Sequence, residues 1–265
     1  MIDANSAPHP TPGHQAPHIA SGPANNPQSQ PVLSARALYR AYGATLALDG
    51  VDLEIRSGES VAIMGPSGSG KSTLLHTLAG IEKPDSGSVL LSTSSGNQQD
   101  ITTLSESARS KLRREAFGFV FQSGLLIPEL TAVENVAMAL MINGVPRAAA
   151  LPQANQWLAA LGLAGMEERR IGQLSGGQAQ RVAIARAQVT GARVIFADEP
   201  TGALDSGTSA EVLGVLMDST VGRGNTLVMV THDADVAARC HRIISLRDGQ
   251  IISQTTGLTQ PGAQH

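Results

Sequence analysis

Cysteine is nearly absent from this sequence, since Cys240 is the only one among 265 residues. A single cysteine excludes a disulfide within the chain and fits a reducing compartment. Aromatic residues are also scarce, at 3%. No apolar run approaches the ~18 residues that a membrane-spanning helix needs, so a partner chain would have to supply any span. The net charge of −3 lacks the basic excess typical of nucleic-acid binding, and we expect no nucleic-acid partner.

Charged side chains are missing from the first part of the chain, where Asp3 is the only one in residues 1–31. Half of the chain's 14 prolines lie in the same segment. Such a segment cannot bury enough apolar surface to offset its ordering entropy, so we expect residues 1–31 to form a disordered, proline-rich tail. The polar residues 254–265 predict a flexible C-terminal tail, which leaves 32–253 as the folded domain.

Between the two tails, short β-rich runs alternate with helical patterns. Strands are expected at 60–64, 117–121, 193–197 and 226–230, and helices at 71–79, 133–141, 148–161, 177–188 and 208–218. This alternation predicts an α/β fold with a mostly parallel sheet and helices on both faces. Segments 38–55 and 87–91 predict additional antiparallel strands, and residues 105–171 predict an inserted helical subdomain.

A glycine-rich run follows the apolar strand at 60–64 and matches the phosphate-binding pattern G-x-x-x-x-G-K-[ST]. Its residues are Gly65, Pro66, Ser67, Gly68, Ser69, Gly70, Lys71, Ser72 and Thr73. Such a run curls its backbone N–H groups around phosphate oxygens at the start of a helix. We expect Lys71 to reach the β- and γ-phosphates and Ser72 to coordinate Mg²⁺. The alternative is a glycine-rich turn that binds nothing.

A pair of acids ends a later apolar strand, where Asp198 and Glu199 follow Val194–Ala197. Alone, such a pair is usually a solvated strand end. After a phosphate-binding loop, it predicts that Asp198 holds Mg²⁺ and that Glu199 polarises the attacking water as a general base.

A second short motif indicates the class of phosphate-binding protein. Its residues are Leu174, Ser175, Gly176, Gly177 and Gln178, at the start of an expected helix. A helix N-terminus offers unpaired N–H donors and partial positive charge to a phosphate. Ser175 is also a good N-cap, but a cap alone does not account for two glycines and Gln178. Together with the phosphate-binding loop, this motif resembles the signature of the ATP-binding-cassette (ABC) transporter ATPases.

The resemblance covers about residues 32–252 and implies that family's fold: a P-loop NTPase domain of the ABC type with a mostly parallel core sheet, an antiparallel β-subdomain and an inserted helical subdomain. It implies an ATPase that uses ATP and Mg²⁺. It also implies a homodimer, because the signature of one copy closes over ATP held by the phosphate-binding loop of the other.

Further positions match family motifs, and the resemblance implies a role for each. Gln122 ends a strand and would contact Mg²⁺ or the attacking water, Asp205 would lie in the D-loop at the dimer seam, and His232 would contact the γ-phosphate. Tyr42 would stack on adenine. Tyr39 is the competing candidate, although strand alternation favours its burial.

Several short runs resemble the lipoprotein-releasing, macrolide-export and cell-division branch of the family. They are Arg113-Arg114 ahead of Phe117–Gln122, Val133–Val136 and Ala197–Gly202. That branch works with a permease that has few transmembrane helices and a large extracytoplasmic domain. The resemblance therefore implies a transporter subunit of the export or extraction type. It would lie at the cytoplasmic face of the membrane and dock on a separate permease near Gln122–Thr131. The alternatives are a cassette ATPase that acts on nucleic acid or scaffolds assembly, and one that signals across the membrane without moving a substrate.

Overall fold

Two sheets and a set of helices form the part of the chain that the computed structural model describes, residues 31–93 and 96–256. Most of the expected tails, residues 1–30 and 257–265, lies outside these residues. The strands are β1 (Pro31–Tyr42), β2 (Thr45–Arg56), β3 (Ser60–Met64), β4 (Ser86–Ser92), β5 (Gln98–Asp100), β6 (Phe117–Phe121), β7 (Val194–Asp198), β8 (Thr226–Val230), β9 (Arg242–Arg247) and β10 (Gln250–Thr256). The α-helices are α1 (Lys71–Leu78), α2 (Glu106–Ala116), α3 (Ala132–Ile142), α4 (Arg147–Ala160), α5 (Gly176–Gln188), α6 (Ser206–Thr220) and α7 (Ala234–Ala238), and the 3-10 turns are η2 (Ile101–Thr103), η3 (Ile171–Gln173) and η4 (Val221–Arg223).

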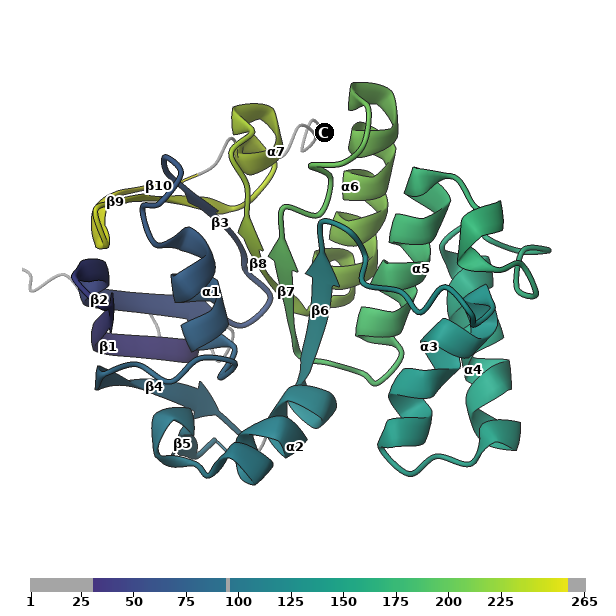
Figure 1. The fold of residues 1–265 in the computed structure, drawn as a ribbon, viewed down its shortest axis with the longest axis horizontal. Helices are drawn as coiled ribbons and strands as arrows, with labels where there is room; N and C mark the ends of the chain where they lie inside the picture. Colours follow the sequence, from purple (N-terminus) through teal and green to yellow (C-terminus); the bar gives the residue numbers. More distant parts are fainter. Residues whose placement is uncertain (1–30, 94–95, 257–265) are drawn as a thin grey trace, which may run out of the picture.

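The core sheet has six strands in the order β10-β9-β3-β8-β7-β6. All neighbours are parallel except β10, which runs antiparallel to β9. Because side chains alternate along a strand, the sheet presents two different apolar faces. One face, with Ile63 and Phe196, packs on α1 and the second sheet, and the other, with Ala62 and Ile195, packs on the helices that follow. The expected α/β fold with a mostly parallel sheet is confirmed (Figure 1).

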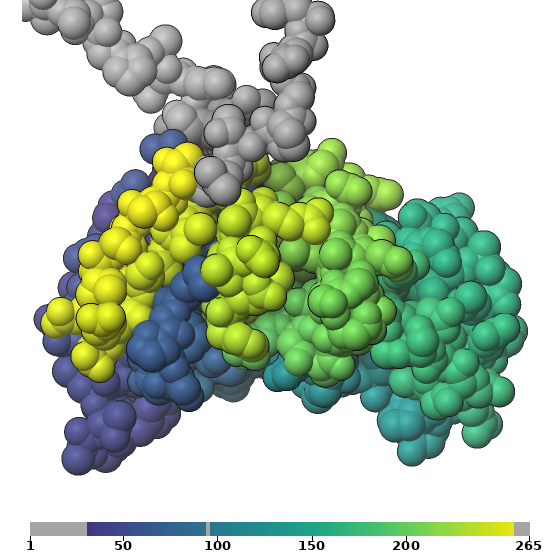
Figure 2. Space-filling view, turned by 90° about the horizontal axis from the view of Figure 1, so that it is seen from above, coloured from purple at the N-terminus to yellow at the C-terminus, as the bar shows by residue number. Residues whose placement is uncertain are grey.

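The second sheet is antiparallel, in the order β2-β1-β4-β5, and it lies with α1 on one side of the core sheet. Helices α3, α4 and α5 form a separate group at the other end of the molecule (Figure 1). Figure 2 shows the same division, with the antiparallel strands in purple and the helical group in teal at opposite ends. Within the described residues, no helix is long and apolar enough to cross a membrane.

Two expected boundaries were wrong. Residues 105–171 do not form one helical subdomain, because β6 lies inside that range as a strand of the core sheet, and α2 packs on β6. The apolar run Phe117–Phe121 pairs with β7 along its whole length, which separates α2 from α3 and α4. The folded domain also includes residues outside 32–253, because β10 pairs with β9 as far as Thr256 and Pro31 of β1 pairs with Arg56 of β2.

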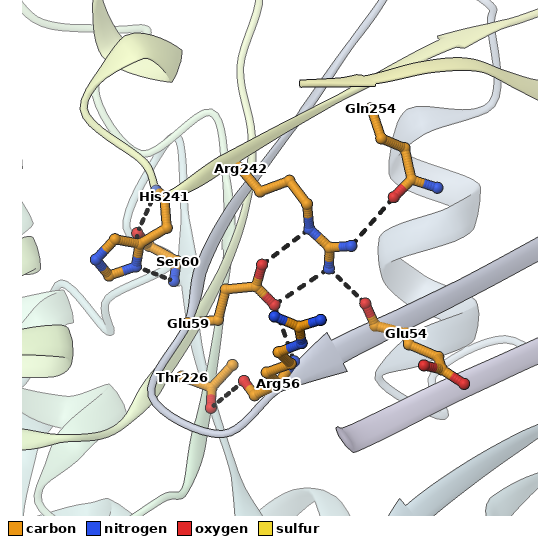
Figure 3. Close-up of polar contacts among 8 residues, drawn as sticks. All are labelled: Glu54, Arg56, Glu59, Ser60, Thr226, His241, Arg242 and Gln254. Carbon is orange, nitrogen blue, oxygen red and sulfur yellow. Dashed lines mark hydrogen bonds and ion pairs between the residues drawn. The ribbon is translucent and has the colours of Figure 1, made fainter. Parts of the chain in front are cut away.

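A cluster of polar side chains joins both sheets where the parallel strands of the core sheet begin (Figure 3). The Arg242 guanidinium lies 2.8 Å from Glu59 Oε1, and it donates to Gln254 Oε1 at 3.1 Å and to the Glu54 carbonyl. His241 Nδ1 accepts the Ser60 N–H at 3.0 Å, and Ser60 Oγ accepts the His241 N–H at 2.9 Å. We call these residues, Glu54, Glu59, Ser60, His241, Arg242 and Gln254, the amino-edge cluster.

Candidate functional site

The glycine-rich run forms a tight loop between β3 and α1. Gly65, Gly68 and Gly70 all have positive φ, at 153°, 78° and 99°. A Cβ at Gly65 would lie 2.1 Å from the Leu246 carbonyl oxygen, and one at Gly70 would lie 2.1 Å from the Ala47 carbonyl oxygen. Glycine is therefore required at both positions by backbone conformation and by the approach of β9 and β2.

This loop has the properties of an anion site. Helix α1 begins after Gly70 and has no side-chain cap, so the free N–H groups of its first turn lack side-chain acceptors. Ser69 is buried, and its hydroxyl has no hydrogen-bond partner among the residues that the structure describes. The Lys71 ammonium donates to the Pro66 carbonyl at 2.9 Å. A phosphate placed here would accept hydrogen bonds from backbone donors and gain the attraction of a cation and a helix N-terminus.

Asp198, at the end of β7, lies beside the first turn of α1. Ser72 Oγ lies 3.4 Å from Asp198 Oδ1, and His76 Nε2 lies 3.9 Å from Asp198 Oδ2. Burial raises the pKa of the Asp198 carboxyl, and the His76 side chain partly opposes that shift. Hydroxyl and carboxylate oxygens are ligands that Mg²⁺ prefers, so Ser72 and Asp198 are suited to hold this ion together with phosphate oxygens.

Glu199 follows Asp198 with φ at 46°, a left-handed conformation that is strained for a non-glycine residue. This backbone turn places the Glu199 carboxylate near His232 and Gln122, which were both expected in the site. His232 Nδ1 lies 3.3 Å from Glu199 Oε2. A Cβ at Gly202 would lie 3.0 Å from Gln122 Nε2 and 3.3 Å from Glu199 Oε2. Ser72, Gln122, Asp198 and Glu199 line one cavity of about 580 Å³, so residues from the first turn of α1 and from the ends of β6 and β7 meet at a single place.

Tyr42 ends β1 with 44% of its surface exposed, and its hydroxyl donates to Glu82. Tyr39 was expected to be buried, but it is 40% exposed. The reason is a break in alternation, because β1 changes register against β2 on both sides of Leu38, and Leu38 takes the buried position.

The signature motif lies at the start of α5. Ser175 caps this helix, and Gln178 completes a capping box, with its side chain accepting the Ser175 N–H at 3.0 Å. A Cβ at Gly177 would lie 2.4 Å from Thr208 Cγ2, and one at Gly176 would lie 3.0 Å from Leu204 Cδ2. Each of the three residues therefore also has a local structural role, since Gln178 completes the capping box and the glycines allow close packing on Thr208 and Leu204.

Asp205 caps the neighbouring helix α6 and accepts the Thr208 N–H at 3.0 Å. Hydrogen bonds from Thr208, its backbone N–H first, lower the pKa of the Asp205 carboxyl. The two capped helices α5 and α6 pack on the face of the core sheet opposite to α1. The phosphate-binding loop and the signature thus belong to opposite layers of the same chain.

Comparison with known proteins supports the sequence resemblance. The family model described as "ABC transporter" matches residues 48–202, which is more than half of the chain. The chain belongs to the ABC transporter family. It carries that family's ATPase cassette.

Named relatives of this ABC cassette include export proteins. It is 43% identical over 239 residues to a macrolide export ATP-binding/permease protein, MacB, of Nitrosomonas europaea, covering 88% of this chain and 35% of that protein. It is 45% identical over 242 residues to a pyoverdine export ATP-binding/permease protein, PvdT, of Pseudomonas aeruginosa, covering 89% and 36%. The chain thus spans about one third of the length of these relatives.

A solved structure agrees over the whole cassette. The dimeric post-hydrolysis state of the ATP-binding cassette MJ0796, bound to ADP and Pi, superposes with a TM-score of 0.76 and 37% identity, covering 86% of this chain and 100% of that one.

Two polar residues of the ABC cassette site escaped the sequence analysis. His76 contacts Asp198 as described, and its Nδ1 lies 3.6 Å from Glu82 Oε1. The helical spacing contained a signal, because His76 follows Ser72 by four residues and so shares its helix face. Glu82 had no comparable signal, since it lies in the loop after α1 and meets Tyr42 only through the tertiary fold.

Proposed function

We propose that this cassette binds ATP with Mg²⁺, hydrolyses it in a homodimer and powers a separate membrane permease of the export type. The observation that supports this most directly is the convergence of Ser72, Gln122, Asp198 and Glu199 on one cavity at the carboxyl end of the core sheet. Lys71 and the N-terminal amides of α1 bind the β- and γ-phosphates, and Tyr42 stacks on adenine.

Hydrolysis follows from the arrangement around Glu199. Its carboxylate takes a proton from the attacking water, Gln122 orients that water, and His232 donates a hydrogen bond to the γ-phosphate. Bound Mg²⁺, held by Ser72 and Asp198, would neutralise the charge that develops on the phosphate oxygens. The strained turn at Glu199 keeps the carboxylate beside Gln122 and His232.

The partner copy completes the site. The signature N-terminus lies in the layer opposite to its own α1. A head-to-tail pair brings the Ser175 hydroxyl and the N–H groups of Gly176 and Gly177 to the γ-phosphate held by the other chain. Asp205 lies at the seam between the two copies. ATP binding then stabilises the dimer, and hydrolysis of ATP allows the two copies to separate.

The loop after Gln122 is suited to transmit dimer formation and separation to a permease. The Arg186 guanidinium donates to the Gly124 and Leu125 carbonyls at 2.7 Å each, which ties the loop to α5. The fully buried Asn135 side chain accepts the Ile127 N–H at 2.8 Å and donates to the Ile127 carbonyl at 3.1 Å, which ties it to α3. The loop therefore moves with the helical group. Leu125 is 59% exposed and offers apolar surface to a partner.

Membrane recruitment tests the permease part of the proposal. Glu129 is exposed on this loop, and Glu168 is an exposed acid elsewhere in the helical group. The tagged cassette should co-purify one integral membrane protein from solubilised membranes. Glu129→Arg, or Leu126→Trp, should lose it while keeping ATP affinity, and Glu168→Arg should retain it. Equal binding of all variants to protein-free lipid vesicles would contradict the proposal.

A further inference from the structure

Tyr42 is held by two contacts that the phosphate chemistry does not require. The Arg40 guanidinium carbon lies 4.7 Å from the centroid of the Tyr42 ring, within the range of a cation–π contact. At the other end of the ring, the hydroxyl donates to Glu82. One face of the ring is thus covered and its hydroxyl is fixed, while 44% of the Tyr42 surface stays exposed.

Arg40 is itself held in place by Asp85. Its Nη1 donates to Asp85 Oδ1 at 2.8 Å, and Asp85 Oδ2 accepts the Ala41 N–H at 2.7 Å. The Asp85 N–H in turn donates to the Tyr39 carbonyl at 2.8 Å. The Ala41 N–H and then the Arg40 guanidinium hold the pKa of Asp85 below its usual range, so the acceptor is a carboxylate at neutral pH. The guanidinium therefore lies over the ring in a defined position rather than free in solvent.

We infer that Arg40 is a positioning residue for the adenine base: anchored by Asp85, it covers one face of Tyr42 and leaves a single, pre-oriented face for the base to stack on. This inference rests on the proposed ATP site. A ring that is already ordered loses less side-chain entropy when the base binds. We expect the effect to be confined to the base, because the contacts that hold Arg40 are with Tyr42 and Asp85.

Calorimetric titration with ATP and with inorganic tripolyphosphate, each with Mg²⁺, separates the base from the phosphates. Arg40→Met keeps the length of the side chain and removes the cation, and it should weaken ATP binding about three- to tenfold while leaving tripolyphosphate binding unchanged. Arg40→Lys should recover part of the loss, and Asp85→Asn should show a smaller loss. Arg36→Met is the matched control, since Arg36 also lies on β1 and pairs with an exposed acid, Glu54, away from Tyr42.

A double-mutant cycle with Tyr42→Ala excludes a direct effect of the charge on the phosphates. If Arg40 acts through the ring, Arg40→Met should cause no further loss in the Tyr42→Ala background. An equal loss in both backgrounds, a parallel loss of tripolyphosphate binding, or wild-type ATP affinity in Arg40→Met would overturn the inference. Failure of the proposed function is distinguishable, because Lys71→Ala would then leave ATP binding intact in the same titration.

Discussion

The two edges of the core sheet are built in opposite ways. At the edge where the strands begin, the amino-edge cluster satisfies its charges internally, with Arg242 shared among Glu59, Gln254 and the Glu54 carbonyl (Figure 3). At the edge where they end, the Ser69 hydroxyl has no partner within the described residues, Asp198 is half-buried with a raised pKa, and Glu199 has a strained backbone. One edge is arranged for stability, and the other leaves its polar groups ready for a ligand.

This difference indicates how stability and activity are divided within one sheet. Substitutions at the carboxyl edge should change ATP chemistry with little loss of stability, because those groups have few protein partners. Substitutions at the amino edge should do the reverse. The following experiments test that division, from the largest expected effect to the smallest.

Glu199→Gln should show the largest effect. Removal of a general base lowers kcat by about 10²- to 10⁴-fold, while ATP still binds. The trapped ATP complex should accumulate as a dimer in size-exclusion chromatography with ATP and Mg²⁺. His232→Ala should also bind ATP and hydrolyse it slowly. Asp235→Asn is the control, since Asp235 lines the neighbouring cavity. Wild-type turnover in Glu199→Gln would contradict the assigned role.

Lys71→Ala should weaken ATP binding about 100-fold or more, because the ammonium meets phosphate charge in the ground state. The melting temperature should stay near the wild-type value, since the hydrogen bond to the Pro66 carbonyl is a contact within the same loop. Calorimetry measures the affinity, and Lys83→Ala, an exposed lysine after α1, is the matched control. If Lys71→Ala bound ATP as tightly as Lys83→Ala, Lys71 would not bind the phosphates.

At the amino edge, Arg242→Met should lower the free energy of unfolding by about 1–3 kcal/mol, because Glu59 keeps its charge and loses its cationic partner. The Glu59 side chain is only 14% exposed. ATP affinity should not change. Urea denaturation gives the stability, with Arg247→Met, an exposed arginine on the same strand, as control. A change in ATP affinity without a loss of stability would remove the distinction between the edges.

Asp198→Asn should show the smallest effect on folding, in the opposite direction. Burial raises the folded-state pKa of Asp198, so its ionised form costs stability once the pH exceeds the unfolded value of about 3.9. The asparagine variant should therefore melt higher than wild type at pH 7, and the gain should vanish below about pH 4. Thermal melts across this range, with the exposed Asp218→Asn as control, measure it. A gain in melting temperature that persists below about pH 4 would show that the variant is stabilised by packing rather than by removal of a charge.

The sequence predicted most of the carboxyl edge because its chemistry is local. The phosphate-binding loop, the acids after β7 and His232 after β8 each follow a strand, and parallel strands place their ends together. Tertiary effects were not predictable in this way. The register shift in β1 exposes Tyr39, and Glu82 meets Tyr42 only through the tertiary fold.

The packing role of the signature glycines was also beyond sequence reasoning. Gly177 is required by the approach of Thr208, and Gly176 leaves room for Leu204, and no spacing rule contains these contacts. The C-terminal limit of the folded domain was not predictable either, because β10 is held by pairing with β9 and has no apolar pattern.

The central claim is that each ATP site is shared between two chains, and a mixing experiment tests it most directly. Chains with Lys71→Ala lack the phosphate-binding half, and chains with Ser175→Phe lack the signature half. Neither should hydrolyse ATP alone. A random mixture should regain about a quarter of the wild-type sites, because half the dimers are mixed and each holds one complete site. A mixture that stays as inactive as the separate variants, although both are folded, would contradict the account.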